Sequence, residues 1–168
     1  LPDRASIDEA DQVDYVKQYA ERVLQSVDSA GIGFVQAASF FQNGLAGRLI
    51  ADRLGVPLVY EMRGLEWFTR GSLDPAWRRT KAGTVARKVE LEAARQADHV
   101  FAITGALRSW LIDQGLPESK VSVLPNGCNP EPMPTDAPDH DELAAELGFQ
   151  DAFVVGYVGS VVFYEGIE

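Results

Sequence analysis

Four short apolar runs recur along the chain, separated by longer segments with helical periodicity. The runs are rich in β-branched and aromatic residues and mostly lack the polar alternation of a half-exposed strand. Such runs are typical of parallel strands that are covered on both faces. They occupy residues 32–38, 58–62, 99–103 and 121–124. The sequence therefore predicts four buried strands.

Helical segments are predicted around these runs. Ser6 and Glu9 match a capping box, and apolar residues then recur every three or four positions, so one face of this first helix should be buried. That face holds Val13, Val16, Ala20, Val23 and Val27. Further helices are predicted over residues 45–54, 75–97 and 104–114, the last capped by Thr104. Residues 65–74 fit no regular period, and we expect a loop or lid there.

The alternation of strand and helix is typical of a Rossmann-like α/β fold, a parallel sheet with flanking helices. Right-handed crossovers place the carboxyl ends of all strands at one edge, where open sheets bind ligands. Four segments should meet at that edge: residues 39–44, 63–66, 104–105 and 126–127.

The chain changes character at Asn126-Gly127, a pair that tolerates positive φ and predicts a tight turn. Prolines at 130, 132, 134 and 138 follow, and they suit an extended connector. A new helix and a strand over residues 153–158 come next. We therefore predict a first domain over residues 1–125, a hinge over 126–138 and the start of a second domain over 139–168.

Charge excludes one class of partner. The 168 residues hold 25 acidic and 15 basic side chains, a formal net charge of −10, whereas a nucleic-acid partner demands a basic surface. Residues 76–97 are locally basic, however. That segment can meet phosphates or an anionic membrane surface, or it can simply be a solvated helix face.

The cysteine count, the spacing of possible metal ligands and the length of the apolar runs exclude further structural features. One cysteine excludes an internal disulfide, so a reducing compartment, the cytoplasm, is expected. No metal-ligand spacing is present, so no metal is predicted. No run reaches the roughly 20 apolar residues of a membrane span. The chain does not begin with Met and opens directly into a helix, and we expect it to be a piece of a longer protein.

Six motifs in order resemble a known family. They are Phe-Phe-Gln-Asn-Gly-Leu-Ala at 40–46, Val-Tyr-Glu-Met-Arg-Gly at 59–64, the segment 90–98 ending in Ala-Asp, Ala-Ile-Thr-Gly-Ala-Leu at 102–107, Val-Leu-Pro-Asn-Gly at 123–127, and Gly-Tyr-Val-Gly-Ser at 156–160 followed by Tyr164-Glu165-Gly166. Together these motifs resemble the retaining GT-B glycosyltransferases of family 4, from about residue 32 onward.

The resemblance implies two Rossmann-like domains that face each other across a cleft. The first would hold the acceptor, a saccharide, lipid-linked or small molecule, and the second a UDP- or GDP-linked sugar. No separate cofactor is implied. This chain would then be a partial GT-B fold, holding the later part of the first domain and the start of the second. By itself it is expected to be inactive, and its catalytic residues are not identified.

The resemblance also assigns roles to residues. Gly159 and Ser160 would form an anion-binding turn for the donor diphosphate, and Glu165 and Gly166 would open the next helix near the same phosphates or the sugar. On the acceptor side lie Asn43, Gly44, Arg63 and Thr104. Helix capping is the alternative role for Asn43 and Thr104, and an ion pair with Glu61 or Glu66 is the alternative for Arg63.

Several alternatives stay open. Many relatives carry His-Ala-His where this chain has Gln36-Ala37-Ala38, which leaves room for a non-catalytic binding or assembly module. A sugar-nucleotide epimerase shares the architecture. Trp67, Phe68 and Trp77 either form an aromatic patch for a lipid acceptor or a membrane interface, or they pack in the core. Open sheet edges also favour pairing with a second copy, a homo-oligomer.

Overall fold

The computed structural model describes residues 9–129, 140–150, 152–159 and 161. The chain divides into two compact units, residues 1–126 and residues 127–168. The domain boundaries predicted above stay a prediction. The predicted capping Ser6 and the proline-rich stretch 130–138 lie outside the described residues.

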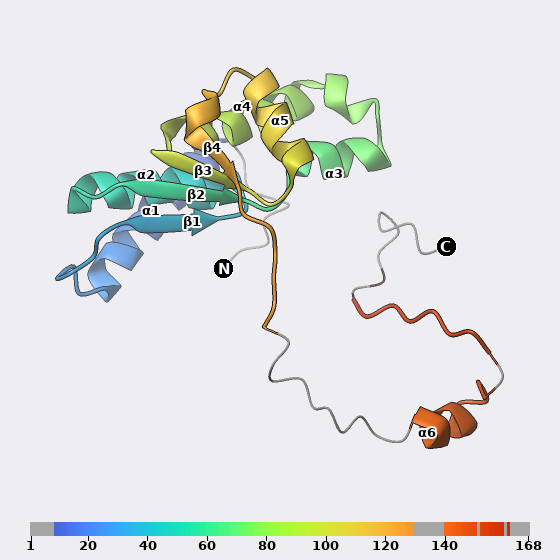
Figure 1. The fold of residues 1–168 in the computed structure, drawn as a ribbon. Helices are drawn as coiled ribbons and strands as arrows, with labels where there is room; N and C mark the ends of the chain where they lie inside the picture. The colour runs from blue at the N-terminus through green and yellow to red at the C-terminus, as the bar shows by residue number, and fades with distance from the viewer. Residues whose placement is uncertain (1–8, 130–139, 151, 160, 162–168) are drawn as a thin grey trace. The chain divides into compact units, whose positions relative to one another are not determined.

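A four-stranded parallel sheet forms the centre of the first unit (Figure 1). Its strands are β1 (Val35–Ala38), β2 (Leu58–Met62), β3 (His99–Ala102) and β4 (Val121–Val123), and their order in the sheet is their order in the chain. Tyr60 in β2 is in register with Ala37 in β1 and Val100 in β3. The predicted Rossmann-like parallel sheet is confirmed.

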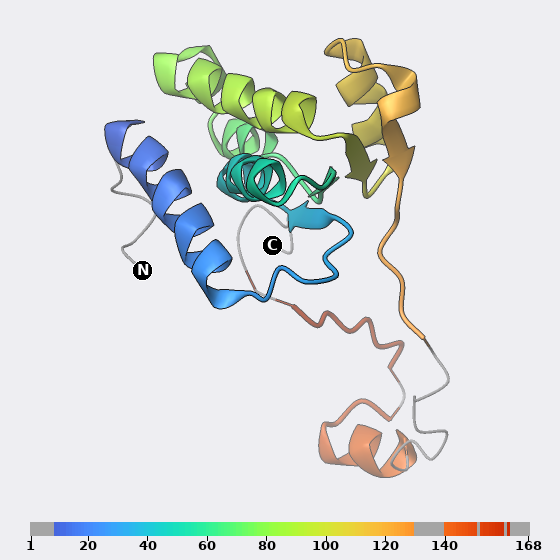
Figure 2. The same cartoon turned by 90° about the vertical axis from the view of Figure 1, so that its left-hand side faces the viewer.

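One helix precedes β1, and further helices connect the strands. In the first unit they are α1 (Glu9–Ser26), α2 (Phe41–Leu54), α3 (Glu66–Leu73), α4 (Lys81–Gln96) and α5 (Gly105–Asp113), with short 3₁₀ turns η2 (Trp77–Arg79) and η3 (Glu118–Lys120). Figure 2 shows α2 between α1 and α4, and α2 contacts both of these helices. Val16 and Ala20 of α1 are buried as predicted, but Val13 and Val27 are exposed, so the buried stripe of α1 is shorter than its sequence indicates.

One face of the sheet carries the core. Alternate residues of the strands point to the same face, and Leu58, Tyr60 and Val100 belong to one buried cluster with residues of α2, α4 and α5. Their alternation partners point to the other face, where Gln36 and Glu61 are hydrogen-bonded. The helices therefore cover the face that carries Tyr60.

Two glycines let α2 lie close to the sheet. A Cβ atom at Gly47 would lie 2.9 Å from Leu58 Cδ1, and one at Gly44 would lie 3.0 Å from Tyr60 Cε2, both in β2. Both distances are too short for ordinary side-chain contact, so any larger residue would push the helix away. Close helix-to-sheet packing is therefore the reason for Gly44.

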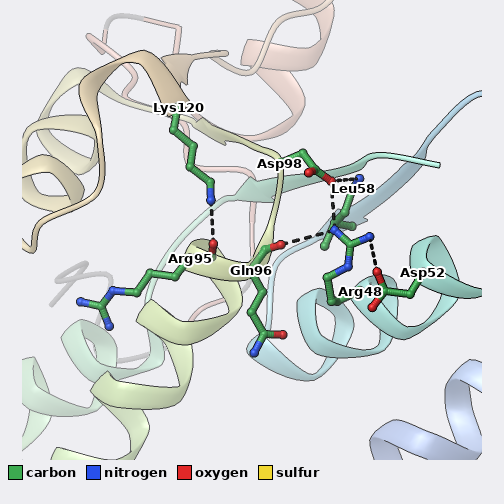
Figure 3. Close-up of polar contacts among 7 residues, drawn as sticks. All are labelled: Arg48, Asp52, Leu58, Arg95, Gln96, Asp98 and Lys120. Atoms are coloured by element: carbon green, nitrogen blue, oxygen red, sulfur yellow. Dashed lines mark hydrogen bonds and ion pairs between the residues drawn. The ribbon is translucent and has the colours of Figure 1, made fainter. Parts of the chain in front are cut away.

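A carboxylate at the start of β3 joins three elements (Figure 3). Asp98 Oδ2 accepts hydrogen bonds from the backbone N–H of Leu58, at 2.7 Å, and from Arg48 Nη1, at 2.9 Å. The backbone N–H of Asp98 donates in return to the Leu58 carbonyl at 2.9 Å. These donors, the Leu58 N–H first, hold the pKa of Asp98 below its usual range. Asp98 thus fixes the beginning of β2 against β3 and against α2.

The sequence prediction for residues 65–97 is wrong in two respects. Residues 66–73 form α3 rather than a loop, and the long helix predicted over 75–97 breaks at Thr80. Thr80 is extended and accepts the Gly83 N–H at 3.1 Å, so it caps a new helix. A Cβ atom at Gly83 would lie 2.3 Å from the Trp77 carbonyl oxygen, so η2 and α4 meet in a tight corner. Helix α2 also begins at Phe41, four residues before its predicted start.

The second unit contains α6 (His140–Glu146). The strand predicted over 153–158 is not formed in the structure, and the side chains of Phe153 and Val158 are exposed there. A parallel strand needs a neighbour to pair its backbone, and the described residues of this unit supply none. No helix in the described part of the chain is long and apolar enough to cross a membrane.

Replacing Asp98 should test the joint between β2, β3 and α2. We expect Asp98→Ala to lower the free energy of unfolding by about 1–3 kcal/mol, because the buried Leu58 N–H loses its acceptor. The pKa of Asp98 is lowered in the folded state, so this stabilisation should be present above about pH 4 and be lost as the pH falls through the folded value. Urea unfolding at neutral and acidic pH measures both effects.

Asp14→Ala, at an exposed position of α1, is the matched control. This control should change stability by no more than about 0.5 kcal/mol. An equal effect of the two substitutions would contradict the role assigned to Asp98.

Candidate functional site

The carboxyl ends of the four parallel strands lie at one edge of the sheet. Arg63 follows β2 directly, Thr104 lies two residues after β3, and Asn43 and Gly44 lie in the first turns of α2, just after β1. The structure therefore places the four predicted acceptor-side residues in the segments that leave this edge.

Arg63 belongs to a polar chain that spans β1 and β2. Its Nε donates to Glu61 Oε1 at 2.7 Å, and Gln36 Nε2 donates to Glu61 Oε2 at 2.7 Å. The Glu61 side chain is only 9% exposed, whereas that of Arg63 is 55% exposed. The hydrogen bond from Arg63 is the main cause that lowers the pKa of Glu61. Glu61 thus holds the guanidinium at Nε, while more than half of the Arg63 side chain stays exposed.

The ion pair expected for Arg63 is therefore present, with Glu61 as its partner. Glu66 instead pairs with Arg70 at 2.8 Å. A guanidinium held at Nε can still bind a phosphate or carboxylate through its two terminal nitrogens. Structural pairing and ligand binding by Arg63 are therefore compatible.

Asn43 and Gly44 stabilise the turn between β1 and α2. Asn43 Nδ2 donates to the Ala38 carbonyl at 2.8 Å, and the backbone N–H groups of both residues donate to the Phe40 carbonyl. Ser39 in the same turn has φ of 59°, unusual for a residue other than glycine. The Tyr60 hydroxyl donates to the Ser39 carbonyl at 2.8 Å and so supports that conformation.

Thr104 caps α5. Its Oγ1 accepts the Leu107 N–H at 3.1 Å, as the sequence predicts. The residue is exposed at the same edge. The ligand roles of Asn43, Gly44 and Thr104 stay predictions.

Sequence reasoning missed Glu90, a buried acid that organises this edge. Glu90 in α4 is 5% exposed, and its carboxylate accepts the backbone N–H of Glu66 at 2.6 Å and that of Trp67 at 3.4 Å. These are the first two residues of α3, whose own N-cap residue, Leu65, provides no side-chain cap. Glu90 therefore caps α3 from another helix and fixes the segment that follows Arg63.

A signal for Glu90 is present in the sequence. Glu90 shares a helical face with Ala93, Ala94 and Ala97, all of them buried. A carboxylate in an otherwise apolar stripe is costly unless it is hydrogen-bonded, so its presence indicates a specific partner. The partner could not be identified because α3 itself was not predicted.

Burial is the main cause that raises the pKa of Glu90, to about 7, and the nearby Glu66 carboxylate adds to the rise. The hydrogen bonds from the backbone act in the opposite direction but do not cancel the effect of burial. Burial raises the pKa of the Tyr60 phenol, and the nearby Glu90 carboxylate adds to that rise. The capping carboxylate therefore changes its charge near neutral pH.

The hinge and donor-side residues are less fully described. Asn126 ends the first compact unit and Gly127 begins the second. Gly159 is exposed, while Ser160, Glu165 and Gly166 lie outside the described residues. Within the described ranges, no group of three or more His, Cys, Asp or Glu side chains could hold a metal ion.

Comparison with known families identifies the first unit. The profile of the glycosyl transferase 4-like domain matches residues 8–127. The chain belongs to the glycosyl transferase 4-like family. The matched region contains all four strands and the edge that carries Arg63. The family resemblance inferred from the motifs is thereby confirmed.

Solved structures agree on the fold of this glycosyl transferase 4-like chain. HepE (Alr3699) of Anabaena in complex with UDP is 19% identical, covers 94% of this chain and has a TM-score of 0.60. Its complex with UDP-glucose is 19% identical and covers 84% of the chain with a TM-score of 0.50. The likeness confirms the predicted partial GT-B fold. This chain spans 38% of the length of HepE in the UDP complex. No curated protein matches the chain.

Replacing Glu90 should change how stability depends on pH. The folded pKa of Glu90, about 7, exceeds the unfolded value of about 4.3, so its contribution to stability is fully present below about pH 4 and is lost as the pH rises through about 7. Glu90→Gln cannot ionise. We therefore expect its free energy of unfolding, relative to the wild type, to rise by about 3 kcal/mol between pH 5 and pH 8.

Urea unfolding across this pH range measures the difference. Glu92→Gln, at an exposed position of the same helix, is the matched control. If the free energy of unfolding of both variants, relative to the wild type, changed with pH to the same extent, the effect could not be assigned to Glu90.

Proposed function

We propose that the protein containing this chain is a retaining glycosyltransferase that moves a sugar from a nucleotide sugar to a saccharide, lipid-linked or small-molecule acceptor. The family match over residues 8–127 is the observation that carries this proposal. HepE, which shares the fold, is described in complexes with UDP and with UDP-glucose. We therefore favour a UDP-linked donor over a GDP-linked one.

The first unit would bind the acceptor at the carboxyl edge of its sheet. Arg63 is the residue best suited to this, because Glu61 orients its guanidinium and more than half of its side chain is exposed. A fixed guanidinium binds an oxyanion or a sugar hydroxyl with little loss of conformational freedom. Thr104 and the turn at Asn43 would border the same site.

The donor would be held mainly by the second domain. Backbone N–H groups at Gly159 and Ser160, followed by a helix beginning near Glu165 and Gly166, would stabilise the diphosphate as it leaves. Such stabilisation needs no metal ion. Bending at Asn126 and Gly127 would close the two domains over the substrates. We place the reaction in the cytoplasm because the single cysteine fits a reducing compartment.

Nucleotide binding tests the proposal directly. Calorimetric titration of UDP, GDP and UDP-glucose is performed on this chain and on a longer protein that contains it together with a complete second domain. We expect UDP and UDP-glucose to bind the longer protein more tightly than this chain, because the donor site lies mainly in the second domain. If neither of the two proteins bound UDP, GDP or UDP-glucose, the glycosyltransferase proposal would be contradicted and a non-catalytic module would be favoured.

Arg63→Gln tests the acceptor side in the longer protein. We expect the KM for the acceptor to rise by about tenfold, since one charge-assisted hydrogen bond is lost, while the Kd for UDP stays unchanged. Arg53→Gln, an exposed substitution in α2, should alter neither value. Equal acceptor KM values for the Arg63 variant and the wild type would remove Arg63 from the acceptor site.

A further inference from the structure

The corner formed by α3, η2 and the start of α4 is strongly basic in an acidic protein. Residues 66–88 hold six cationic and two anionic side chains, while the whole chain carries −10. The cations are Arg70, Arg78, Arg79, Lys81, Arg87 and Lys88. Such segregation costs repulsion within the corner and favours an anionic partner there.

Two of these cations share one aromatic ring. The guanidinium carbons of Arg78 and Arg87 lie 4.9 and 5.4 Å from the centre of the Trp67 ring. Trp67 also packs edge-on against Phe68 and is stacked on Trp110 at 6.4 Å. Of the three aromatic residues singled out in the sequence, Trp67 and Phe68 pack with Trp110, which lies against the buried core, whereas Trp77 lies under Arg70.

Within the described part of the chain, neither arginine forms an ion pair with a carboxylate. Among the described residues, the ion pairs of arginine involve Arg48, Arg63, Arg70 and Arg108. The Nε atoms of Arg78 and Arg87 are buried and have no hydrogen-bond partner in the described part of the chain. Their terminal nitrogens contact only neutral groups there, the Phe68 carbonyl for Arg78 and the Gln114 side-chain oxygen for Arg87.

Glycines in the corner leave room for Arg78 to lie against α3. A Cβ atom at Gly71 would lie 1.9 Å from Arg78 Nε, so only glycine lets that side chain lie against α3. Gly83 allows α4 to approach η2 in the same way, next to the Trp77 carbonyl. Arg78 therefore lies packed against α3, whereas an ordinary surface cation extends into solvent.

We propose that Arg78, Arg87 and Trp67 form a binding site for a phosphate group. Two guanidinium groups match the charge of a phosphate, and their planar forks match its oxygens. The phosphate can belong to a soluble phosphate ester or to the head group of an anionic lipid. In the second case Phe68, 36% exposed, and Leu73, 40% exposed, supply apolar contacts on the same helix. This site does not depend on sugar transfer or on the donor site.

Two probes separate the sources of phosphate. Inorganic phosphate is titrated into the protein while tryptophan fluorescence is recorded, and sedimentation measures binding to vesicles of phosphatidylcholine with and without phosphatidylglycerol. Binding of inorganic phosphate assigns a soluble ligand, and binding only to the phosphatidylglycerol vesicles assigns a lipid. We expect Arg78→Gln to weaken whichever binding occurs by about tenfold.

Neighbouring residues provide the controls. Arg79→Gln changes the net charge equally but removes no cation from the Trp67 ring, and it should weaken binding less than twofold. If Arg78→Gln does not fold, as judged by circular dichroism, Arg87→Gln is compared with Lys88→Gln in the same way. Equal weakening by variant and control, or absence of binding to both probes, would overturn the proposal.

Discussion

The structure of the first unit depends on the hydrogen bonds made by one carboxylate, that of Asp98. It binds the first amide of β2 from the position just before β3, and through Arg48 it reaches α2. Strand pairing, helix docking and register are therefore fixed at the same point. Because the opposite ends of these strands carry Arg63 and Thr104, a shift at Asp98 would displace the candidate site at the other edge of the sheet.

Much of this fold could be predicted because its signals are local. The apolar run 58–62 coincides with β2, and Thr104 caps α5 as its position indicates. The predicted helix 75–97 was wrong although this signal is local too, since Thr80 caps a new helix by accepting the Gly83 N–H. The strand predicted over 153–158 depends on a partner, and a short sequence window does not contain that information.

The sequence could likewise locate some residues of the candidate site and not others. Arg63 could be located because it follows a buried strand, and the carboxyl ends of parallel strands all lie at one edge of the sheet. The roles of Gln36 and Glu90 could not be predicted, since each depends on a partner about 25 residues away in sequence, at Glu61 and Glu66. Arg78 and Arg87 were recognised only as part of a basic segment, because their common contact with Trp67 is created by the fold.

The order of strands in the sheet has a consequence for how the chain can assemble. Since β1 to β4 follow one another both in sequence and in space, no strand must be inserted between two that are already paired. Each crossover helix can pack as soon as the strand after it has been synthesised, so the sheet can grow from one side during translation. The sheet and helices of this unit can thus assemble outside the ribosome while the residues that follow Asn126 are still in the exit tunnel.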